Sequence, residues 1–213
     1  MDFLGSRAAE GGVVSPLLAN IFLHAMDEEL DSRGISWVRY ADDFLLLCET
    51  RAEAEAALEA VRAVLERLGL TLSPEKTRIR HLDEGFDFVG WHYQGHRRWP
   101  RSKSVKALRL KLREKTRRLR PGSMELICGE ITPILRGWFI YFRTGNSGST
   151  FGHLVSWVRR RLRSILHRRH KGHGIGSPAL SRRWPNRCFH AWGLFDPQAA
   201  LATYRQLGRA VSC

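Results

Sequence analysis

Two adjacent carboxylates, Asp42 and Asp43, stand between two apolar segments of the chain. Residues 37–40 precede the pair and residues 44–47 follow it, and both segments have the composition of β-strands. This spacing predicts a tight hairpin with the two carboxylates at its tip. Carboxylate oxygens are ligands that hard divalent cations such as Mg²⁺ accept. The sequence therefore predicts a metal site suited to phosphoryl transfer.

A simpler interpretation of the pair is a surface turn. Aspartate is a favoured turn residue because its side chain can hydrogen-bond to its own backbone. Against this, residues 44–48 are continuously apolar, and such a run is typical of a strand buried on both faces. A buried strand would tie the turn to a core, where two idle carboxylates are costly. We therefore favour a functional role for Asp42 and Asp43.

Charge is divided unevenly along the 213 residues, which carry a net charge of +14. Residues 1–100 hold 11 Lys and Arg against 17 Asp and Glu, a net charge of −6. Residues 101–213 hold 24 against 4, a net charge of +20. Such a concentration of positive charge predicts a polyanionic partner, and it places nucleic-acid binding in the second half.

The basic residues of the second half could be solvent-facing charges that only keep helices soluble. However, no acidic residue occurs between Glu130 and Asp196, so the surface would repel itself without phosphates. Aromatic residues are interspersed among these basic residues, and unpaired bases can stack on such side chains. However, Trp138, Tyr141 and Phe142 have the spacing of a buried helix face, so most of them are expected in the core and only one or two could contact RNA. The candidate RNA-binding residues are Lys103, Lys106, Arg109, Arg113, Arg117, Arg136, Arg143, Arg159, Arg160, Arg163, Arg168 and Arg169.

The four cysteines share no short spacing, which disfavours a zinc ribbon or a disulfide framework and favours a reducing compartment. Histidines among arginines more often contact phosphate than zinc, which weakens a zinc site built from His167, His170, His173, Cys188 and His190. The sequence shows no secretory signal and no apolar run near 18 residues. We expect a soluble, cytoplasmic protein without a membrane partner.

The first hundred residues predict mixed helices and strands. Ser15 and Pro16 can start a helix whose buried stripe would be Leu18, Ile21, Phe22 and Ala25. A second helix is expected to start at a Thr50–Glu53 capping box, bury Val61, Val64, Leu65 and Leu68, and end at Gly69. Residues 86–91 alternate as in a strand, with Trp99 on a hairpin partner.

The residues after Arg101 predict helices only. Val105, Leu108, Leu112 and Leu119 fall on one face of the first of these helices. Further helices are expected at residues 131–142, at residues 151–166 and, as a short one, after Pro197. The two halves meet near residues 99–104, where Pro100 coincides with the onset of basic charge. The fold class is therefore α+β.

Five segments together resemble the reverse transcriptase and maturase proteins encoded by group II introns. Residues 11–23 resemble the loop and helix before the catalytic hairpin, and Tyr40-Ala41-Asp42-Asp43 resembles the hairpin itself. The two later palm motifs are similar to residues 72–77 and 86–90, and the maturase-specific helix is similar to residues 133–142. The resemblance covers nearly the whole chain.

This resemblance implies a partial polymerase palm, an antiparallel hairpin sheet with packed helices, over residues 1–100. An all-α thumb and maturase domain would follow over residues 101–213. Asp42 and Asp43 would be catalytic ligands of two Mg²⁺ ions, and Lys76, Tyr40 and Gly11 would contact the incoming nucleotide. The implied partners are group II intron RNA and an RNA template with a DNA primer.

The chain departs from this family in two places. Family members supply a further metal-binding aspartate from a strand upstream of the glycine loop, whereas ten residues precede Gly11 here. Glu10 also places negative charge where the family usually has glutamine. We expect a truncated protein that binds intron RNA for splicing and mobility but does not synthesise DNA alone, unless a separately encoded N-terminal fragment completes it.

Two alternatives remain open from the sequence. The chain could be a non-catalytic RNA-binding splicing factor with a vestigial palm. The palm half could also fail to fold, which would leave only the helical half ordered, because missing partner strands expose sheet edges.

Overall fold

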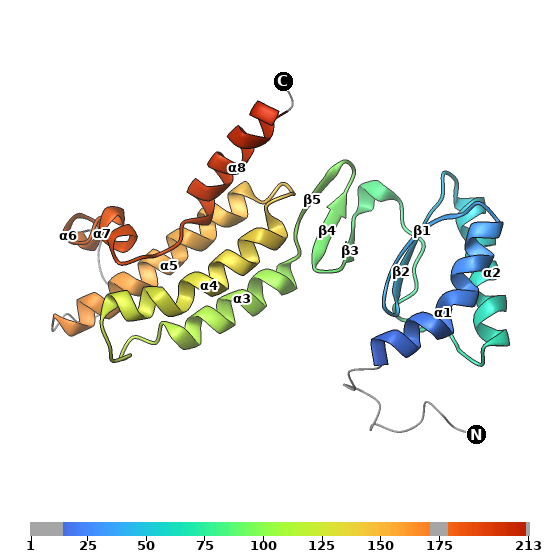
Figure 1. Cartoon of the computed structure of the whole chain (residues 1–213), viewed down its shortest axis with the longest axis horizontal. Helices are drawn as coiled ribbons and strands as arrows, with labels where there is room; N and C mark the ends of the chain where they lie inside the picture. Colours follow the sequence, from blue (N-terminus) through green and yellow to red (C-terminus); the bar gives the residue numbers. More distant parts are fainter. Residues whose placement is uncertain (1–14, 171–178, 212–213) are drawn as a thin grey trace. The chain divides into compact units, whose positions relative to one another are not determined.

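The computed structural model describes residues 15–170 and 179–211. The chain divides into two compact units, Met1–His81 and Leu82–Cys213. Both units contain a small antiparallel sheet, so the described chain is mixed α/β with a helical majority (Figure 1).

The first unit is a hairpin packed against two helices. Helix α1 (Ser15–Ser32) leads into strand β1 (Ser36–Tyr40), which pairs antiparallel with β2 (Asp43–Leu47) before helix α2 (Arg51–Arg67). Both helices contact the sheet and each other (Figure 1). Their shared core consists of Leu23, Met26, Leu30, Val61, Val64 and Leu65.

Helix α2 confirms its sequence prediction. The Thr50 hydroxyl accepts a hydrogen bond from the Glu53 backbone N–H at 3.2 Å, which caps the first turn. The Glu53 carboxylate in turn accepts from the backbone N–H of Glu49 at 3.0 Å. Gly69 closes the helix with φ +71°, a conformation that glycine adopts without strain.

The predicted buried stripe of α1 is wrong. Leu18, Ile21, Phe22 and Ala25 are exposed, whereas Leu23, Met26, Asp27 and Leu30 face the core. The first half of α1 is apolar on more than one side, and periodicity could not decide which side a two-stranded sheet and one helix would cover. The apolar surface of Leu18 and Ile21 therefore stays 60% and 65% exposed.

The expectation that β2 is buried on both faces is also wrong. Phe44 and Leu46 point toward the helices and join the core. On the opposite face, Val38 is 48% exposed and Leu47 is 54% exposed. The hairpin has two strands, and the described elements of this unit cover only one of its faces.

The second unit begins with a three-stranded meander. Strands β3 (Phe86–Phe88), β4 (Trp91–Gln94) and β5 (Arg97–Pro100) pair antiparallel in that order after a short helix, η1 (Leu82–Glu84). The single strand predicted for residues 86–91 is wrong, because Val89 and Gly90, with φ +43° and +81°, form a two-residue hairpin loop. Trp99 lies on a neighbouring strand, as predicted, opposite His92.

The rest of the second unit is helical, as predicted, but the helix after Pro197, which was expected to be short, spans 15 residues. The helices are α3 (Ser102–Lys115), α4 (Met124–Phe142), α5 (Gly148–Arg169), α6 (Ala179–Arg183), α7 (Asn186–Ala191) and α8 (Pro197–Val211). Leu119 was wrongly placed on the buried face of the first helix, because α3 ends at Lys115 and Leu119 is 77% exposed beyond it.

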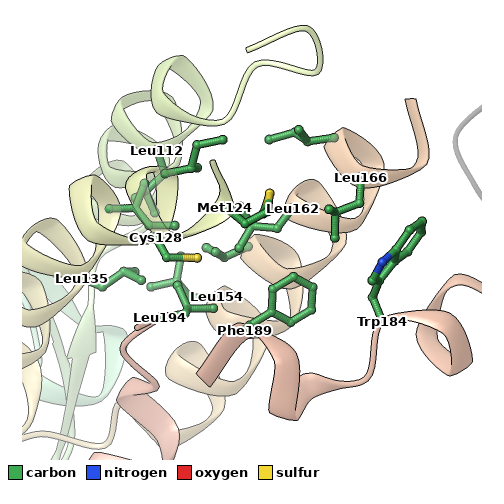
Figure 2. Packing of buried hydrophobic residues seen from close by; sticks show 14 of the residues in the cluster. Leu112, Met124, Cys128, Leu135, Leu154, Leu162, Leu166, Trp184, Phe189 and Leu194 are labelled. Carbon is green, nitrogen blue, oxygen red and sulfur yellow. The ribbon is translucent and has the colours of Figure 1, made fainter. Parts of the chain in front are cut away.

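The core of the second unit lies between α3, α4 and α5, which run side by side (Figure 1). Figure 2 shows how Leu112, Cys128, Leu135 and Leu162 meet there, with Phe189 of α7 packed on the same cluster. Phe189, Leu112, Cys128 and Leu162 have no accessible surface. This continuous core holds the helices in fixed positions.

The small sheet packs on α4 and so belongs to the helical unit, although its residues precede the boundary expected near residues 99–104. The Trp91 and Phe142 rings lie 4.8 Å apart between centroids. The Tyr141 hydroxyl donates to the Val89 carbonyl oxygen at 2.7 Å. A Cβ at Gly145 would lie 2.3 Å from the Trp91 ring, so this close approach requires glycine.

Candidate active site and RNA interface

The two carboxylates lie at the tip of the predicted hairpin. Tyr40 pairs with Asp43, so Ala41 and Asp42 form a two-residue loop. Ala41 has φ +56°, the sign that primed hairpin turns require at their first loop position. Asp42 and Asp43 are both exposed to solvent. The turn thus presents two oxygen-donor side chains at the end of a strand pair.

Strand alternation sets the direction of the Asp43 carboxylate. Because Phe44 points into the core, Asp43 points to the outer face, where it neighbours Tyr40 across the strands. Asp42 lies in the loop itself. Across residues 15–170 and 179–211, no group of three or more His, Cys, Asp or Glu side chains is arranged to hold a metal ion. The donor type fits Mg²⁺, but these residues supply only part of a coordination shell.

A buried ion pair fixes the base of the hairpin turn. The Arg39 guanidinium donates from Nε to Oδ1 of Asp27 at 2.9 Å, and its Nη2 also contacts Oδ2. Arg39 Nη1 donates to the Ala41 carbonyl oxygen at 3.1 Å and to Asn20 Oδ1 at 2.8 Å. The hydrogen bond with Asp27 raises the pKa of Arg39. Arg39 therefore ties α1 to the backbone of the loop that carries Asp42.

Sequence reasoning missed this ion pair. Asp27 follows Leu23 by four residues and is only 9% exposed, so it lies on the buried stripe of α1. A carboxylate at such a position requires a cationic partner. The buried position of Asp27 therefore indicates a cationic partner, but it does not identify Arg39 as that partner.

The predicted nucleotide-binding residues occupy different settings. Tyr40 is 65% exposed on the outer face of the hairpin. Lys76 is exposed in a turn after α2, where its backbone N–H donates to the Ser73 carbonyl oxygen at 3.1 Å. Gly11 lies outside the described residues. The structure therefore places Tyr40 beside Asp43, and Lys76 on a separate loop of the same unit.

Most of the predicted RNA-binding residues have exposed side chains on the second unit. Arg109, Arg143 and Arg163 are half-buried, and Arg159 is buried. The Cζ atom of Arg109 lies 5.8 Å from the centroid of the Trp157 ring, and the Cζ atom of Arg143 lies 4.6 Å from the centroid of the Tyr204 ring. The exposed members are Lys103, Lys106, Arg113, Arg117, Arg136, Arg160, Arg168 and Arg169.

Several arginines of this set hold the fold together. Arg159 is 9% exposed and donates to Asp196 Oδ2 at 2.7 Å, so its charge is compensated inside the protein. Arg163 donates to the Trp184 carbonyl oxygen at 2.9 Å, and Arg169 to that of Gly122 at 2.6 Å. A structural role therefore replaces the phosphate contact expected of Arg159.

Arg161, which was not among the candidates, has a similar structural role. Its Nη2 donates to the Thr116 carbonyl oxygen at 2.7 Å, and its Nε donates to the Thr116 hydroxyl at 2.6 Å. This carbonyl lies at the C-terminal end of α3, where the helix leaves acceptors unpaired. Burial lowers the pKa of Arg161. Part of the basic charge that was predicted to bind RNA is therefore engaged in hydrogen bonds at a helix end.

The aromatic residues of α4 divide between core and surface. Phe142 is buried, Trp138 is partly buried, and Tyr141 is 47% exposed. The burial of Phe142 and Trp138 agrees with the prediction that most of them belong to the core, and a contact with RNA stays a prediction.

Two of the histidines considered for a zinc site make other contacts. The His170 ring lies 5.5 Å from the Trp184 ring, and His190 Nε2 lies 3.1 Å from Arg159 Nη2. His173 lies outside the described residues. Cys48, Cys128 and Cys188 are free thiols, and burial raises the pKa of Cys128 to about 11. None of the helices in the described ranges is long and apolar enough to span a membrane.

Comparisons with known proteins match two consecutive parts of the chain. Residues 4–93 match a family model described as reverse transcriptase (RNA-dependent DNA polymerase), and residues 105–187 match the group II intron maturase-specific domain. The chain is also 34% identical to Protein YkfC of Escherichia coli (strain K12) over an alignment of 116 residues. That alignment covers 38% of this chain and 30% of YkfC, so the chain spans under a third of its relative. The chain thus carries a partial reverse transcriptase domain followed by a group II intron maturase-specific domain, and the two matches together support a group II intron reverse transcriptase and maturase.

Proposed function

We propose that the chain binds group II intron RNA and thereby supports intron splicing and mobility. The observation that carries this proposal is the charge of the maturase half, where residues 101–213 hold 24 basic side chains against 4 acidic ones. Arginines such as Arg159 and Arg163 are engaged inside the fold, but eight of the predicted cations remain exposed. A surface of this kind attracts phosphate backbones by releasing their counterions.

In this proposal, residues 1–100 correspond to the later part of a polymerase palm, and residues 101–213 to a thumb with the maturase domain. An RNA template with a DNA primer would be a further partner in an assembled polymerase. The matched family models support this assignment, because their boundary between residues 93 and 105 lies close to it.

Asp42 and Asp43 are the residues that would hold Mg²⁺, the metal that this family generally uses. A bound ion would stabilise negative charge on the reacting phosphates. The chain holds the loop that carries these ligands in place. Arg39 donates a hydrogen bond to the Ala41 carbonyl oxygen of the loop and is itself paired with Asp27. Tyr40, Lys76 and Gly11 would contact the nucleotide.

We also propose that the chain alone does not polymerise DNA. Two metal ions about 4 Å apart need ligands that converge from more than one strand. Asp42 and Asp43 come from one turn, and the described residues bring no third acidic ligand to them. Primer extension on an RNA template by the purified chain tests this point, and efficient extension would refute it. A separately supplied N-terminal reverse transcriptase fragment should restore activity.

Electrophoretic mobility shift with a group II intron transcript tests RNA binding. The double charge reversal Lys103→Glu/Lys106→Glu removes two exposed cations of α3 and should weaken binding by more than tenfold. As a control, Arg62→Glu/Arg67→Glu changes the net charge equally on α2 and should have a much smaller effect. Equal losses in both variants would indicate non-specific attraction and contradict an interface on the second unit.

The second candidate function is a non-catalytic RNA-binding splicing factor. The incomplete set of metal ligands at Asp42 and Asp43 favours it. Asp42→Asn separates the two functions in the chain supplemented with the N-terminal fragment. DNA synthesis should collapse if the hairpin is catalytic, whereas RNA binding should persist in either case. A supplemented chain that never extends primers would leave the splicing factor as the function.

A further inference from the structure

An open groove of about 730 Å³ lies within the second unit, between α3, α4 and the loop that joins β3 to β4. Its walls are mainly apolar and come from Ile134, Trp138 and Tyr141 on one side and from α3 on the other. This volume lies within the range of ligand-binding pockets. None of its lining residues belongs to the hairpin that carries Asp42 and Asp43.

One wall of the groove is an aromatic ring held in a fixed position. The Tyr141 hydroxyl donates to the Val89 carbonyl oxygen at 2.7 Å, and the ring lies against Phe142 at 4.7 Å and Trp91 at 6.0 Å. Even so, Tyr141 remains 47% exposed. A ring that is fixed on one side and accessible on the other can stack with a planar ligand at little entropic cost.

A glycine of α4, Gly137, also lines the groove. A Cβ placed at Gly137 would have no atom within 4 Å, apart from its own helix backbone and chain neighbours. Gly137 is therefore not required by close packing, although glycine costs helix stability at such a position. Because Gly137 lines the groove, a larger side chain at this position would extend into open space.

The rim of the groove carries positive charge. Lys111 lines it and is exposed, and none of its lining residues is acidic. Lys103 and Lys106 are exposed on the same helix. A groove lined by both a lysine and an accessible aromatic ring is complementary to a nucleotide, which has an anionic phosphate attached to a flat base.

We infer that this groove receives an unpaired nucleobase of the bound RNA, with the base stacked on Tyr141 and its phosphate near Lys111. The inference rests on the proposed RNA binding and deepens it, because it predicts a preference for RNA with unpaired nucleotides. A fully paired duplex keeps its bases stacked and offers only its backbone to the same surface.

Gly137→Leu is the variant that tests the groove, since its side chain would occupy the open space. Gly129→Leu is the matched control, because Gly129 lies on the same helix, would also have no atom within 4 Å of an added Cβ, and does not line the groove. The full chain is titrated with a hairpin RNA carrying an unpaired loop and with a duplex of equal length. We expect Gly137→Leu to weaken hairpin binding about tenfold, to leave duplex binding unchanged, and Gly129→Leu to change neither.

The possible outcomes distinguish this inference from the proposed function. If the unmodified chain binds neither RNA, both are refuted. If it binds both RNAs and Gly137→Leu binds them equally well, RNA binding stands and the groove assignment is refuted. A measurement without substitutions guards against a variant that does not fold: 4-thiouridine in the loop should photo-crosslink to residues 133–142, and crosslinks confined to other peptides would overturn the assignment.

Discussion

The two units enclose hydrophobic cores of different size. In the second unit, Phe189, Leu112 and Leu162 are fully buried in one continuous core. In the first unit, Leu18, Ile21 and Leu47 remain more than half exposed on helix and strand faces. Exposed apolar faces of this kind typify surfaces that contact another protein element. The helical unit thus encloses the larger continuous core, whereas the described residues of the first unit leave the outer face of the hairpin and one side of α1 uncovered.

The largest effect on stability is expected from a substitution in the core of the second unit. Phe189→Ala should lower the free energy of unfolding by about 3–5 kcal/mol, because it leaves a cavity among fully buried side chains. Urea denaturation followed by tryptophan fluorescence measures the loss. Leu119→Ala is the control, since Leu119 is 77% exposed and its removal should change the stability by less than about 0.5 kcal/mol. A similar loss in both variants would contradict the described core.

A smaller effect is expected at the base of the hairpin. Asp27→Ala leaves the Arg39 guanidinium without its buried partner and should cost about 2–3 kcal/mol. Hydrogen exchange of the β1–β2 amides should accelerate, while that of α3–α5 should not. Glu28→Ala is the control, because the Glu28 side chain is 70% exposed on the same helix. Unchanged exchange in Asp27→Ala would show that the ion pair does not position the loop.

The buried thiol of Cys128 predicts a pH dependence in the helical unit. Burial raises its pKa from 9.0 to about 11, so the folded state favours the neutral thiol. Its contribution to stability is complete below pH 9 and should be lost as the pH rises from 9 toward 11. Denaturation midpoints across this range should fall less steeply in Cys128→Ala than in the unmodified chain. Parallel slopes would contradict the assigned burial.

The smallest effect on stability is expected on the outer face of the β1–β2 hairpin. Leu47→Lys replaces a side chain that is 54% exposed on the outer face of β2, so stability should change by less than about 0.5 kcal/mol. The charge should nevertheless reduce self-association, because it interrupts an apolar sheet face beside open edges. Analytical ultracentrifugation measures this, with Glu49→Lys as a control for charge alone. A strongly destabilised Leu47→Lys would show that the outer face is covered.

Local signals in the sequence were sufficient for several elements. Thr50 and Gly69 mark the ends of α2, because capping is decided by residues within one turn of the helix end. The hairpin that carries Asp42 and Asp43 was predicted for the same reason, since a two-residue loop between apolar strands is a short-range feature. The break at Val89 and Gly90 was missed because the apolar alternation continues on both sides of that turn.

The candidate site was only partly predictable. Its two carboxylates were evident, but Arg39 and Asp27 lie twelve residues apart and meet only through the packing of α1 on the hairpin. The basic residues of the second half were evident as well, whereas the distinction between Arg159, which is ion-paired inside, and Arg160, which is exposed, depends on how α5 is oriented. Helical periodicity gives the spacing of a face without always giving its direction.

The sequence by itself determined the family, the aspartate pair, the ends of α2 and the uneven charge, because each follows from residue type and short-range spacing. The tertiary structure decided which side of α1 is buried, which arginines cap helix ends, and that the β3–β5 sheet packs on α4. These features depend on contacts between segments far apart in the chain, where burial and pairing compete among several chemically acceptable choices.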